Sequence, residues 1–353
     1  MPSDPPMDER AAPDDRRPRL TPPIADVRRA VREALEGLVP DAPGGDGPAG
    51  DAPLVLVALS GGPDSLALAA GTAFEAPRAG LRAGAVIVDH GLQEGSADAA
   101  AAAANQARTL GLEPVVVHPV QVRAGGDGPE ASARAARYAA LDAVARRNGA
   151  VRVLLGHTLD DQAETVLLGL ARGSGAGSLQ GMSADNGQYA RPLLGIRRRT
   201  TRQACHDAGF DPWDDPQNLD PASARVRVRE QVLPVLEHAL GPGVAEALAR
   251  TAEQLREDEA AFADQIDEFI EEICEPAEAG IAVSVQALAA NPAALRQRII
   301  RHVVASEFGT SLSRVQTLEV ARLVTDWHGQ GPIDLPGCRA ARAGGRLEFT
   351  AAG

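Results

Sequence analysis

Short apolar runs alternate with longer helical patterns along residues 54–171 of the chain. Runs typical of buried strands lie at 54–59, 85–88, 114–118 and 151–155. Segments with helical character follow them at 65–74, about 97–110, about 129–147 and about 160–171. This alternation predicts an α/β domain in which helices cover both faces of a parallel sheet.

The pattern changes at both ends of this segment. Residues 1–20 are rich in Pro, Asp and Arg and are predicted to be a disordered extension, and an amphipathic helix is predicted at about 23–38. Beyond Gly241-Pro242-Gly243 we predict a long acidic helix, a strand, two helices and a closing strand pair at 244–273, 281–285, 292–307, 311–327 and 332–349. The chain is therefore predicted to hold a sheet domain over 21–240 and a smaller, mainly helical or α+β domain over 244–353.

Composition excludes several kinds of chemistry. The chain has 353 residues, a net charge of −13 and no lysine, so it lacks the lysine of a Walker A loop, a Schiff base or a lysine–AMP intermediate. The acidic balance argues against generic nucleic-acid binding. Cys205, Cys274 and Cys338 are far apart, which disfavours a disulfide framework or a CxxC pair. No apolar run reaches the roughly 20 residues of a membrane span, and we expect a cytoplasmic protein without a membrane partner.

The most informative segment follows the first predicted strand and reads Ser60-Gly61-Gly62-Pro63-Asp64-Ser65. Its two glycines let backbone N–H groups approach an anion closely, and the start of the next helix adds partial positive charge. The hydroxyls of Ser60 and Ser65 can donate hydrogen bonds to phosphate oxygens. A carboxylate repels phosphate, so Asp64 is predicted to hold a cation, of which Mg²⁺ fits best.

A second polar segment follows the fourth predicted strand. Gly156 and His157 end that strand, and Asp161 and Glu164 then lie on one side of the following helix. Capping of this helix by Thr158 or Asp160 is the structural alternative, and it explains one carboxylate better than the whole set. Asp89 and His90 similarly follow the second strand, either as part of a nucleotide pocket or as an ordinary turn. Because the carboxyl ends of parallel strands share one edge, we expect these segments to converge on one crevice.

Arginines supply all the basic side chains. Arg134 and Arg137 share a predicted helical face with Glu130, where an ion pair is the alternative to a ligand contact. Arg172 opens a glycine-rich segment after the Asp161 helix. Further basic positions, each also typical of a solvated surface, are Arg197, Arg198, Arg199, Arg225, Arg229, Arg296, Arg298 and Arg301.

These segments together resemble a known family. Residues 60–65 are similar to the signature of the PP-loop ATP pyrophosphatases, whose fold is adenine-nucleotide alpha hydrolase-like. The motifs SGGPDS, VDHGL, ExxARxxRY, GHTLDDQAET, RGSGxGSLxGM and RPLLGIRR occur here in that order, and residues 50–230 resemble the tRNA(Ile)-lysidine synthetase family. Residues 333–337 and 344–347 resemble the end of that family's first C-terminal domain.

The resemblance implies a reaction of ATP, free L-lysine and a tRNA(Ile) with the anticodon CAU. The C2 oxygen of the first anticodon cytidine would attack the α-phosphorus of ATP and release pyrophosphate. The lysine ε-amine would then displace AMP, leaving lysidine. The residues implied to bind ATP are Ser60, Gly61, Gly62, Pro63, Asp64, Ser65, Asp89, His90 and His157.

The resemblance also implies individual roles. Asp64 and Asp161 would bind Mg²⁺, Glu164 would hold the substrate lysine, and Arg172 would meet a phosphate of ATP or tRNA. The basic positions at 197–199, 225, 229, 296, 298 and 301 would contact tRNA.

Two positions depart from the family pattern, and several alternatives stay open. Gln93 stands where the family usually has arginine, and Val226 stands where the family's Arg-Asn-x-x-Arg motif has asparagine. A tRNA thiolase or a small-molecule amidating ligase is the enzymatic alternative, and a nucleotide-binding regulatory module is the non-enzymatic one. The oligomeric state is open, with a homodimer among the alternatives.

Overall fold

The computed structural model describes residues 20–38, 52–91, 95–120, 129–173, 176–213, 215, 219–277 and 280–352. The predicted extension at 1–20 therefore lies, except for Leu20, outside the described residues, as does Gln93. The chain divides into two compact units, Met1–Glu253 and Gln254–Gly353.

The first unit is built on a parallel sheet of five strands in the order β3-β2-β1-β4-β5. The strands are β1 (Leu54–Ala58), β2 (Arg82–Asp89), β3 (Val115–Pro119), β4 (Ala150–Leu155) and β5 (Tyr189–Ala190). All four strand pairings are parallel. The predicted α/β fold and its four strands are confirmed. The fifth strand was missed, since two residues carry no periodic signal.

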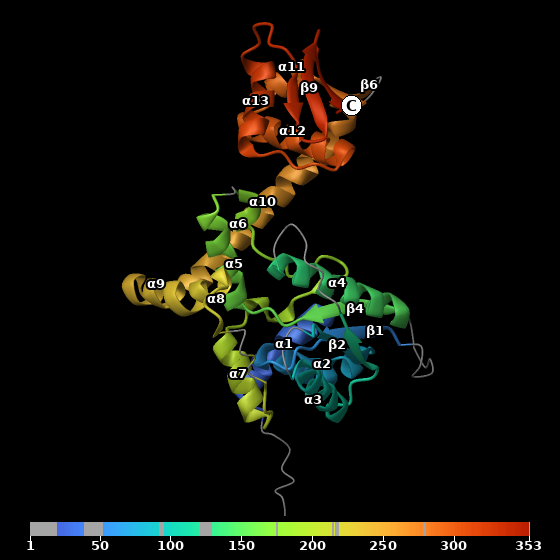
Figure 1. The fold of residues 1–353 in the computed structure, drawn as a ribbon, viewed down its shortest axis with the longest axis vertical. Coiled ribbons are helices and arrows are strands. Elements are labelled where there is room, and N and C mark those ends of the chain that lie inside the picture. The colour runs from blue at the N-terminus through green and yellow to red at the C-terminus, as the bar shows by residue number, and fades with distance from the viewer. Residues whose placement is uncertain are drawn as a thin grey trace, which may run out of the picture. The chain divides into compact units, whose positions relative to one another are not determined.

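Helices cover both faces of this sheet (Figure 1). The alternating side chains of β1 show how, because Leu54 and Leu56 pack with α4 (Pro129–Asn148), whereas Val55 and Val57 pack into the core on the opposite face. The helices of that opposite core are α1 (Pro22–Leu35), α2 (Pro63–Glu75), α3 (Ser96–Thr109) and α7 (Arg198–Asp207). The predicted helices near 23–38, 65–74, 97–110 and 129–147 are confirmed.

The other helices of this unit follow the fourth strand. They are α5 (Leu159–Ala171), α6 (Ala176–Leu179), α8 (Ala224–Arg227) and α9 (Leu233–Leu240), with a π-helical turn at Val228–Val232. Only α5 was predicted. Helix α7 in particular was missed, because its sequence RRTTRQACHD has few apolar residues to reveal a helical period.

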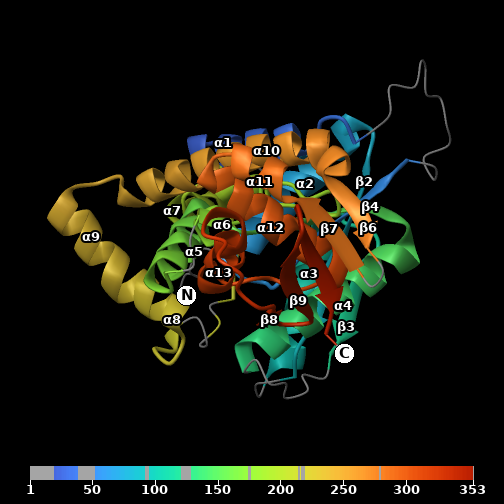
Figure 2. The same ribbon diagram turned by 90° about the horizontal axis from the view of Figure 1, so that it is seen from above.

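The second unit carries an antiparallel sheet in the order β6-β7-β10-β9-β8 (Figure 2). Its strands are β6 (Cys274–Ala277), β7 (Gly280–Ser284), β8 (Ile333–Leu335), β9 (Cys338–Ala343) and β10 (Arg346–Ala351). Its helices are α11 (Val285–Ala290), α12 (Ala293–Phe308) and α13 (Arg314–Thr325), and α10 (Val244–Ile273) contains the division between the units. The predicted closing pair is β9 and β10, which turn at Gly344-Gly345. Short β6, β8 and α11 were missed.

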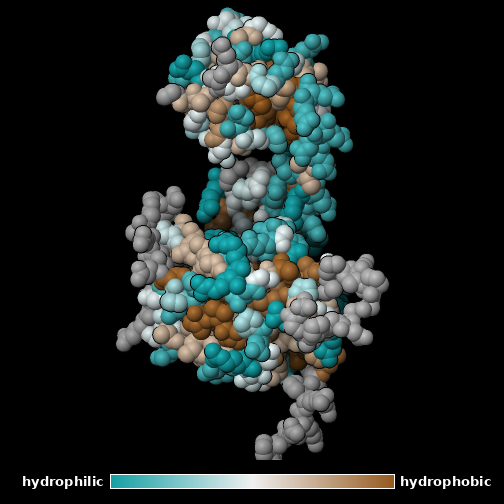
Figure 3. Space-filling view, turned by 90° about the vertical axis from the view of Figure 1, so that its right-hand side faces the viewer, coloured by the Kyte–Doolittle hydropathy of each residue, from teal (hydrophilic) through white to brown (hydrophobic). Residues whose placement is uncertain are grey.

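On the face drawn in Figure 3, brown hydrophobic residues form separate patches among teal hydrophilic ones. Within the part of the chain that the structure describes, no helix is both long and apolar enough to cross a membrane.

Candidate active site

The loop between β1 and α2 has the form that phosphate binding requires. Gly61 has a φ of +84°, a left-handed conformation that favours glycine, and Gly62 precedes the first residue of the helix. The Ser65 hydroxyl accepts a hydrogen bond from the Ser60 N–H at 3.1 Å and donates one to the Gly62 carbonyl at 3.0 Å. These bonds close the loop around the start of α2, where free N–H groups and the helix dipole favour an anion.

The end of β4 lies directly against this loop. A Cβ on Gly156 would stand 3.0 Å from both the N and the Cα of Ser65, and 3.1 Å from the carbonyl carbon of Asp64. Only glycine allows this approach without movement of the backbone. The contact places His157 and the start of α5 beside the phosphate loop.

The first turn of α5 holds one carboxylate in a fixed orientation. The Oδ2 atom of Asp161 accepts hydrogen bonds from the Thr158 N–H and the Thr158 hydroxyl, both at 2.8 Å. Thr158 is the residue that precedes the helix, so the capping interpretation is correct for this oxygen. The other oxygen, Oδ1, makes a separate contact with a cation from α7.

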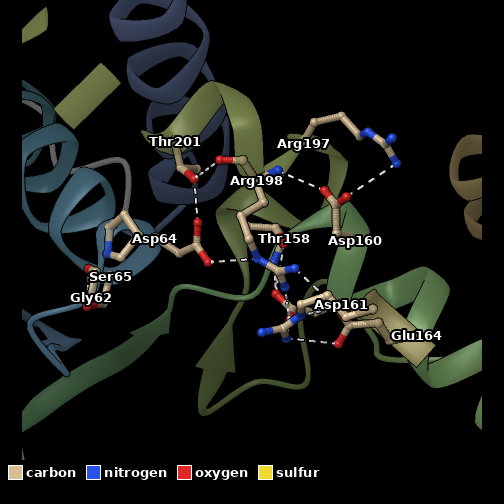
Figure 4. Close-up of polar contacts among 12 residues, drawn as sticks. Gly62, Asp64, Ser65, Thr158, Asp160, Asp161, Glu164, Arg197, Arg198 and Thr201 are labelled. Carbon is tan, nitrogen blue, oxygen red and sulfur yellow. Dashed lines mark hydrogen bonds and ion pairs between the residues drawn. The ribbon is translucent and has the colours of Figure 1, made fainter. Parts of the chain in front are cut away.

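That cation is Arg198, and its guanidinium contacts three carboxylates from two helices (Figure 4). The Nη2 atom lies 2.7 Å from Asp161 Oδ1, Nη1 lies 3.2 Å from Glu164 Oε1, and Nε lies 3.4 Å from Asp64 Oδ2. The Arg198 N–H also donates to Asp160 Oδ2 at 2.7 Å, which fixes the start of α7 against the start of α5. Asp64, Asp161 and Glu164 thus gather around one positive charge.

Each of these three carboxylates has a second partner. Asp64 accepts a short hydrogen bond from the Thr201 hydroxyl, and Asp161 keeps its bonds from Thr158. Glu164, whose side chain is 0% exposed, is bound by Arg229 through Nε–Oε1 at 2.8 Å and Nη2–Oε2 at 3.1 Å. The bidentate contact with Arg229 therefore compensates the charge of the fully buried Glu164.

Burial and charge act on the two aspartates in opposite directions. Burial raises the pKa of Asp64, and the hydrogen bond from Thr201 and the charge of Arg198 offset this only in part. Burial would also raise the pKa of Asp161, but the charge of Arg198 and the Thr158 bonds outweigh it and hold that pKa below its ordinary value. Asp161 is therefore ionised at neutral pH and is a strong ligand for a cation.

A cavity of about 630 Å³ opens over these groups. Its lining includes Gly62, Pro63, Asp64, Ser65, Gly156, His157, Asp161, Arg198 and Arg229. A smaller adjoining cavity of about 130 Å³ is lined by Asp89, His90 and Trp213. Ser60 and Arg137 line both cavities. The three polar segments therefore do converge, on two adjoining cavities.

Two histidines in these cavities are neutral. Burial lowers the pKa of His157 to about 3, and burial together with the charge of Arg137 lowers the pKa of His90. The Nδ1 atoms of both rings are buried without a hydrogen-bond partner in the described part of the chain. An unpaired buried nitrogen is costly, so these atoms are available to a bound molecule.

The other predicted site residues make different contacts. Arg172 follows the last turn of α5, about 16 Å along the helix from Asp161. Arg197 pairs with Asp160, Glu237 and Glu246, and Arg225 donates to Thr165. In the second unit Arg298 pairs with Glu259, Arg296 donates to backbone carbonyls, and burial lowers the pKa of Arg301. Arg199 is exposed.

Several functional residues were not singled out from the sequence as members of this site. Thr201 and the inward direction of Arg198 depend on α7, which has no periodic signal. Arg137 was noticed only as one side of a helical face, and Trp213 was not noticed. The RPLLGIRR motif was the available signal for Arg198.

A divalent cation fits the donor set. Asp64 Oδ2 and Asp161 Oδ1 are carboxylate oxygens that already face a cation, and oxygen is the ligand type that Mg²⁺ prefers. Among the described residues, no group of three or more His, Cys, Asp or Glu side chains forms a metal site by itself. Two protein carboxylates plus substrate phosphates is the usual way in which Mg²⁺ is held.

Comparison with known families defines the class first. The sequence pattern of the PP-loop domain matches residues 42–236, more than half of the chain, and the TilS substrate binding domain matches residues 284–348. The protein is therefore a PP-loop protein with an appended substrate-binding domain, in agreement with the loop and sheet described above.

Similar proteins define the family. The tRNA(Ile)-lysidine synthase of Leifsonia xyli is 62% identical over 329 residues, which cover 92% of this chain and 99% of the relative. The tRNA(Ile)-lysidine synthases of Thermobifida fusca and Streptomyces coelicolor are 52% and 54% identical, covering 91% and 84% of this chain and 95% and 85% of the relatives. The chain belongs to the tRNA(Ile)-lysidine synthase family.

A solved structure supports the fold alone. The U34-tRNA thiolase NcsA from Methanococcus maripaludis, determined with its [4Fe-4S] cluster, superposes with a TM-score of 0.55 at 21% identity. The match covers 67% of this chain and 80% of the thiolase.

Substitution Gly156→Ala tests the close approach of β4 to the phosphate loop. The new Cβ would meet backbone rather than a flexible side chain, so the loop must shift. We expect a loss of about 1–3 kcal/mol in stability and at least a tenfold weaker ATP affinity, measured by thermal unfolding and calorimetry. Gly345→Ala, where a Cβ meets open space, is the control. Unchanged ATP affinity in Gly156→Ala would show that the contact does not position the loop.

Proposed function

We propose that this protein uses ATP to join free L-lysine to the cytidine at the first anticodon position of tRNA(Ile), giving lysidine, AMP and pyrophosphate. The observation that carries the proposal is the group of Asp64, Asp161 and Glu164 beside the phosphate loop in a chain 62% identical to a tRNA(Ile)-lysidine synthase. Binding of ATP alone does not require three carboxylates gathered around one guanidinium. A thiolase or an amidating ligase is not favoured.

The reaction proceeds in two displacements. The C2 oxygen of cytidine attacks the α-phosphorus, the bond from that phosphorus to the bridging oxygen breaks, and pyrophosphate leaves. The unprotonated lysine ε-amine then forms a bond to C2, the bond from C2 to the AMP oxygen breaks, AMP leaves, and the released proton passes to solvent. The phosphate loop, through the backbone around Gly61 and Gly62 and the Ser60 hydroxyl, binds the negative charge of the leaving pyrophosphate. Arg137, which lines both cavities, is placed to meet phosphates that bridge them.

The roles of the carboxylates follow from the cation that their oxygens face in the free protein. Asp64 and Asp161 would hold Mg²⁺, which when bound neutralises charge on the phosphates. Glu164 would bind the ammonium of the substrate lysine. Because Arg198 and Arg229 already contact its oxygens, this binding requires Arg198 to withdraw. His90 and His157, both neutral, would accept or donate a hydrogen bond to the nucleotide.

The tRNA would be shared by the two parts of the chain. We assign catalysis to residues 21–240 and tRNA binding to residues 244–353. Arg199, which is exposed, is better placed to meet tRNA than Arg198, which faces the carboxylates. The distance of Arg172 from Asp161 favours a phosphate of tRNA over one of ATP as its partner. Contacts of the other basic positions with tRNA stay predictions. The formation of a homodimer also stays a prediction.

The direct test is product formation by the purified protein. With ATP, Mg²⁺, lysine and a tRNA(Ile) transcript carrying CAU, we expect lysidine in the digested RNA by mass spectrometry, with AMP formed in equal amount. A transcript with uridine at the first anticodon position, or any other amino acid in place of lysine, should give none. AMP formation without lysidine would contradict the proposed substrate.

Substitution Glu164→Gln tests the lysine site. A charge-assisted hydrogen bond is worth roughly 1.5–3 kcal/mol, so we expect the lysine concentration at half-maximal rate to rise about ten- to a hundredfold. The ATP dependence should change far less. Glu230→Gln is the matched control, because Glu230 lines the cavity beside the cluster and is exposed, whereas Glu164 is buried. A changed ATP dependence with an unchanged lysine dependence would move Glu164 to the nucleotide side.

A further inference from the structure

Arg198 occupies the place where the proposed reaction needs another cation. Its guanidinium contacts Asp64 Oδ2 and Asp161 Oδ1, the oxygens assigned above to Mg²⁺. The side chain is 16% exposed, so it borders the cavity and is not locked in the core. A guanidinium as close as the 2.7 Å of Arg198 to Asp161 Oδ1 and a metal ion cannot share these oxygens, because like charges a few ångströms apart repel by several kcal/mol even at an effective dielectric constant of about 20. The second guanidinium, that of Arg229, lies farther from Asp161 Oδ1, at 3.6 Å, and makes its shorter contacts with Glu164.

The surroundings of Arg198 allow it to leave. The hydrogen bonds from Thr201 to Asp64 and from Thr158 to Asp161 remain, as does the ion pair of Arg229 with Glu164. No carboxylate in the cluster would therefore be left buried without a partner, which is the condition that makes breaking a buried ion pair costly. The start of the helix itself is held independently, because the backbone N–H of Arg198 donates to Asp160 Oδ2 at 2.7 Å.

The charge balance selects the replacement. The three carboxylates carry three negative charges, and Arg229 compensates one of them. Withdrawal of Arg198 therefore leaves a local charge of about −2, which a single divalent cation neutralises. A monovalent ammonium at the same oxygens would leave one negative charge uncompensated.

We propose that Arg198 is an exchangeable positive charge that keeps the carboxylate cluster closed until a divalent cation replaces it. This inference rests on the proposed function, which brings Mg²⁺ to the site with ATP. The guanidinium fills the cluster in the free protein and weakens the binding of metal alone. Metal delivered with ATP displaces it, since the phosphates both add ligands to the metal and offer the released guanidinium a new partner. Arg198 is thus a positioning residue that couples metal entry to nucleotide entry.

The experiment measures binding of Mn²⁺, as manganese chloride, by electron paramagnetic resonance without nucleotide. Arg198→Met should bind Mn²⁺ at least about tenfold more tightly than the unchanged protein, because a competing charge-assisted contact is removed. Arg197→Met removes the same charge one residue earlier, from an arginine that forms ion pairs with Asp160, Glu237 and Glu246. Its Mn²⁺ affinity should stay within about twofold of that of the unchanged protein. Adding Asp161→Asn to Arg198→Met should cancel the gain in Mn²⁺ affinity, because it removes one of the two carboxylates assigned to the metal.

Thermal unfolding supplies a second measurement. Mn²⁺ should raise the melting temperature of Arg198→Met more than that of the unchanged protein. Arg198→Gln takes its place if Arg198→Met does not fold. Unchanged or weaker Mn²⁺ binding in a folded variant would overturn the proposal, and so would tighter binding of lysine without tighter binding of Mn²⁺. Lysidine formation with unchanged Mn²⁺ affinity would refute this inference alone, whereas tighter Mn²⁺ binding without lysidine formation would refute the proposed function alone.

Discussion

The contact of one guanidinium with three carboxylates organises the site. Arg198 begins α7, Asp64 lies in the first turn of α2, and Asp161 and Glu164 lie in the first two turns of α5. Each carboxylate alone would be costly to bury, and together they would repel one another. The positive charges of Arg198 and Arg229 make the cluster stable. In our proposal the charge of Arg198 is also the one that a divalent cation replaces. The geometry of the three helix starts depends on this balance.

The parallel sheet explains why these residues meet. Helices α2 and α5 follow β1 and β4, which are neighbours in the sheet, so both helices start at the same edge. Gly156 removes the side chain that would separate them. The phosphate loop then supplies an anion site, and the carboxylates supply a cation site beside it. ATP with a divalent cation has that same pairing of charges.

The sequence predicted the sheet well, because buried parallel strands are continuous apolar runs and their helices have a clear period. It also predicted that Asp64, His157, Asp161 and Glu164 lie together, since each follows a strand that ends at one edge. It did not predict that Arg198 and Arg229 face inward. The sequence of a polar helix does not show whether an arginine in it contacts solvent, RNA or a buried carboxylate. For Arg198 and Arg229, this depends on where α7 and the Val228–Val232 turn pack in the fold. Arg172 shows the reverse case, because its place directly after α5 in the sequence puts it at the far end of that helix from Asp161.

We propose that the carboxylates serve the phosphate chemistry of ATP and do not bind RNA. Pyrophosphate release by Asp64→Asn, measured with tRNA and lysine at saturating ATP, tests it most directly. Asp98→Asn, an exposed position on α3, serves as the control. We expect Asp64→Asn to release pyrophosphate at least about a hundredfold more slowly, on the order of one lost charge-assisted contact of up to 3 kcal/mol, while its tRNA affinity stays within about twofold. Normal pyrophosphate release with weakened tRNA binding would contradict it.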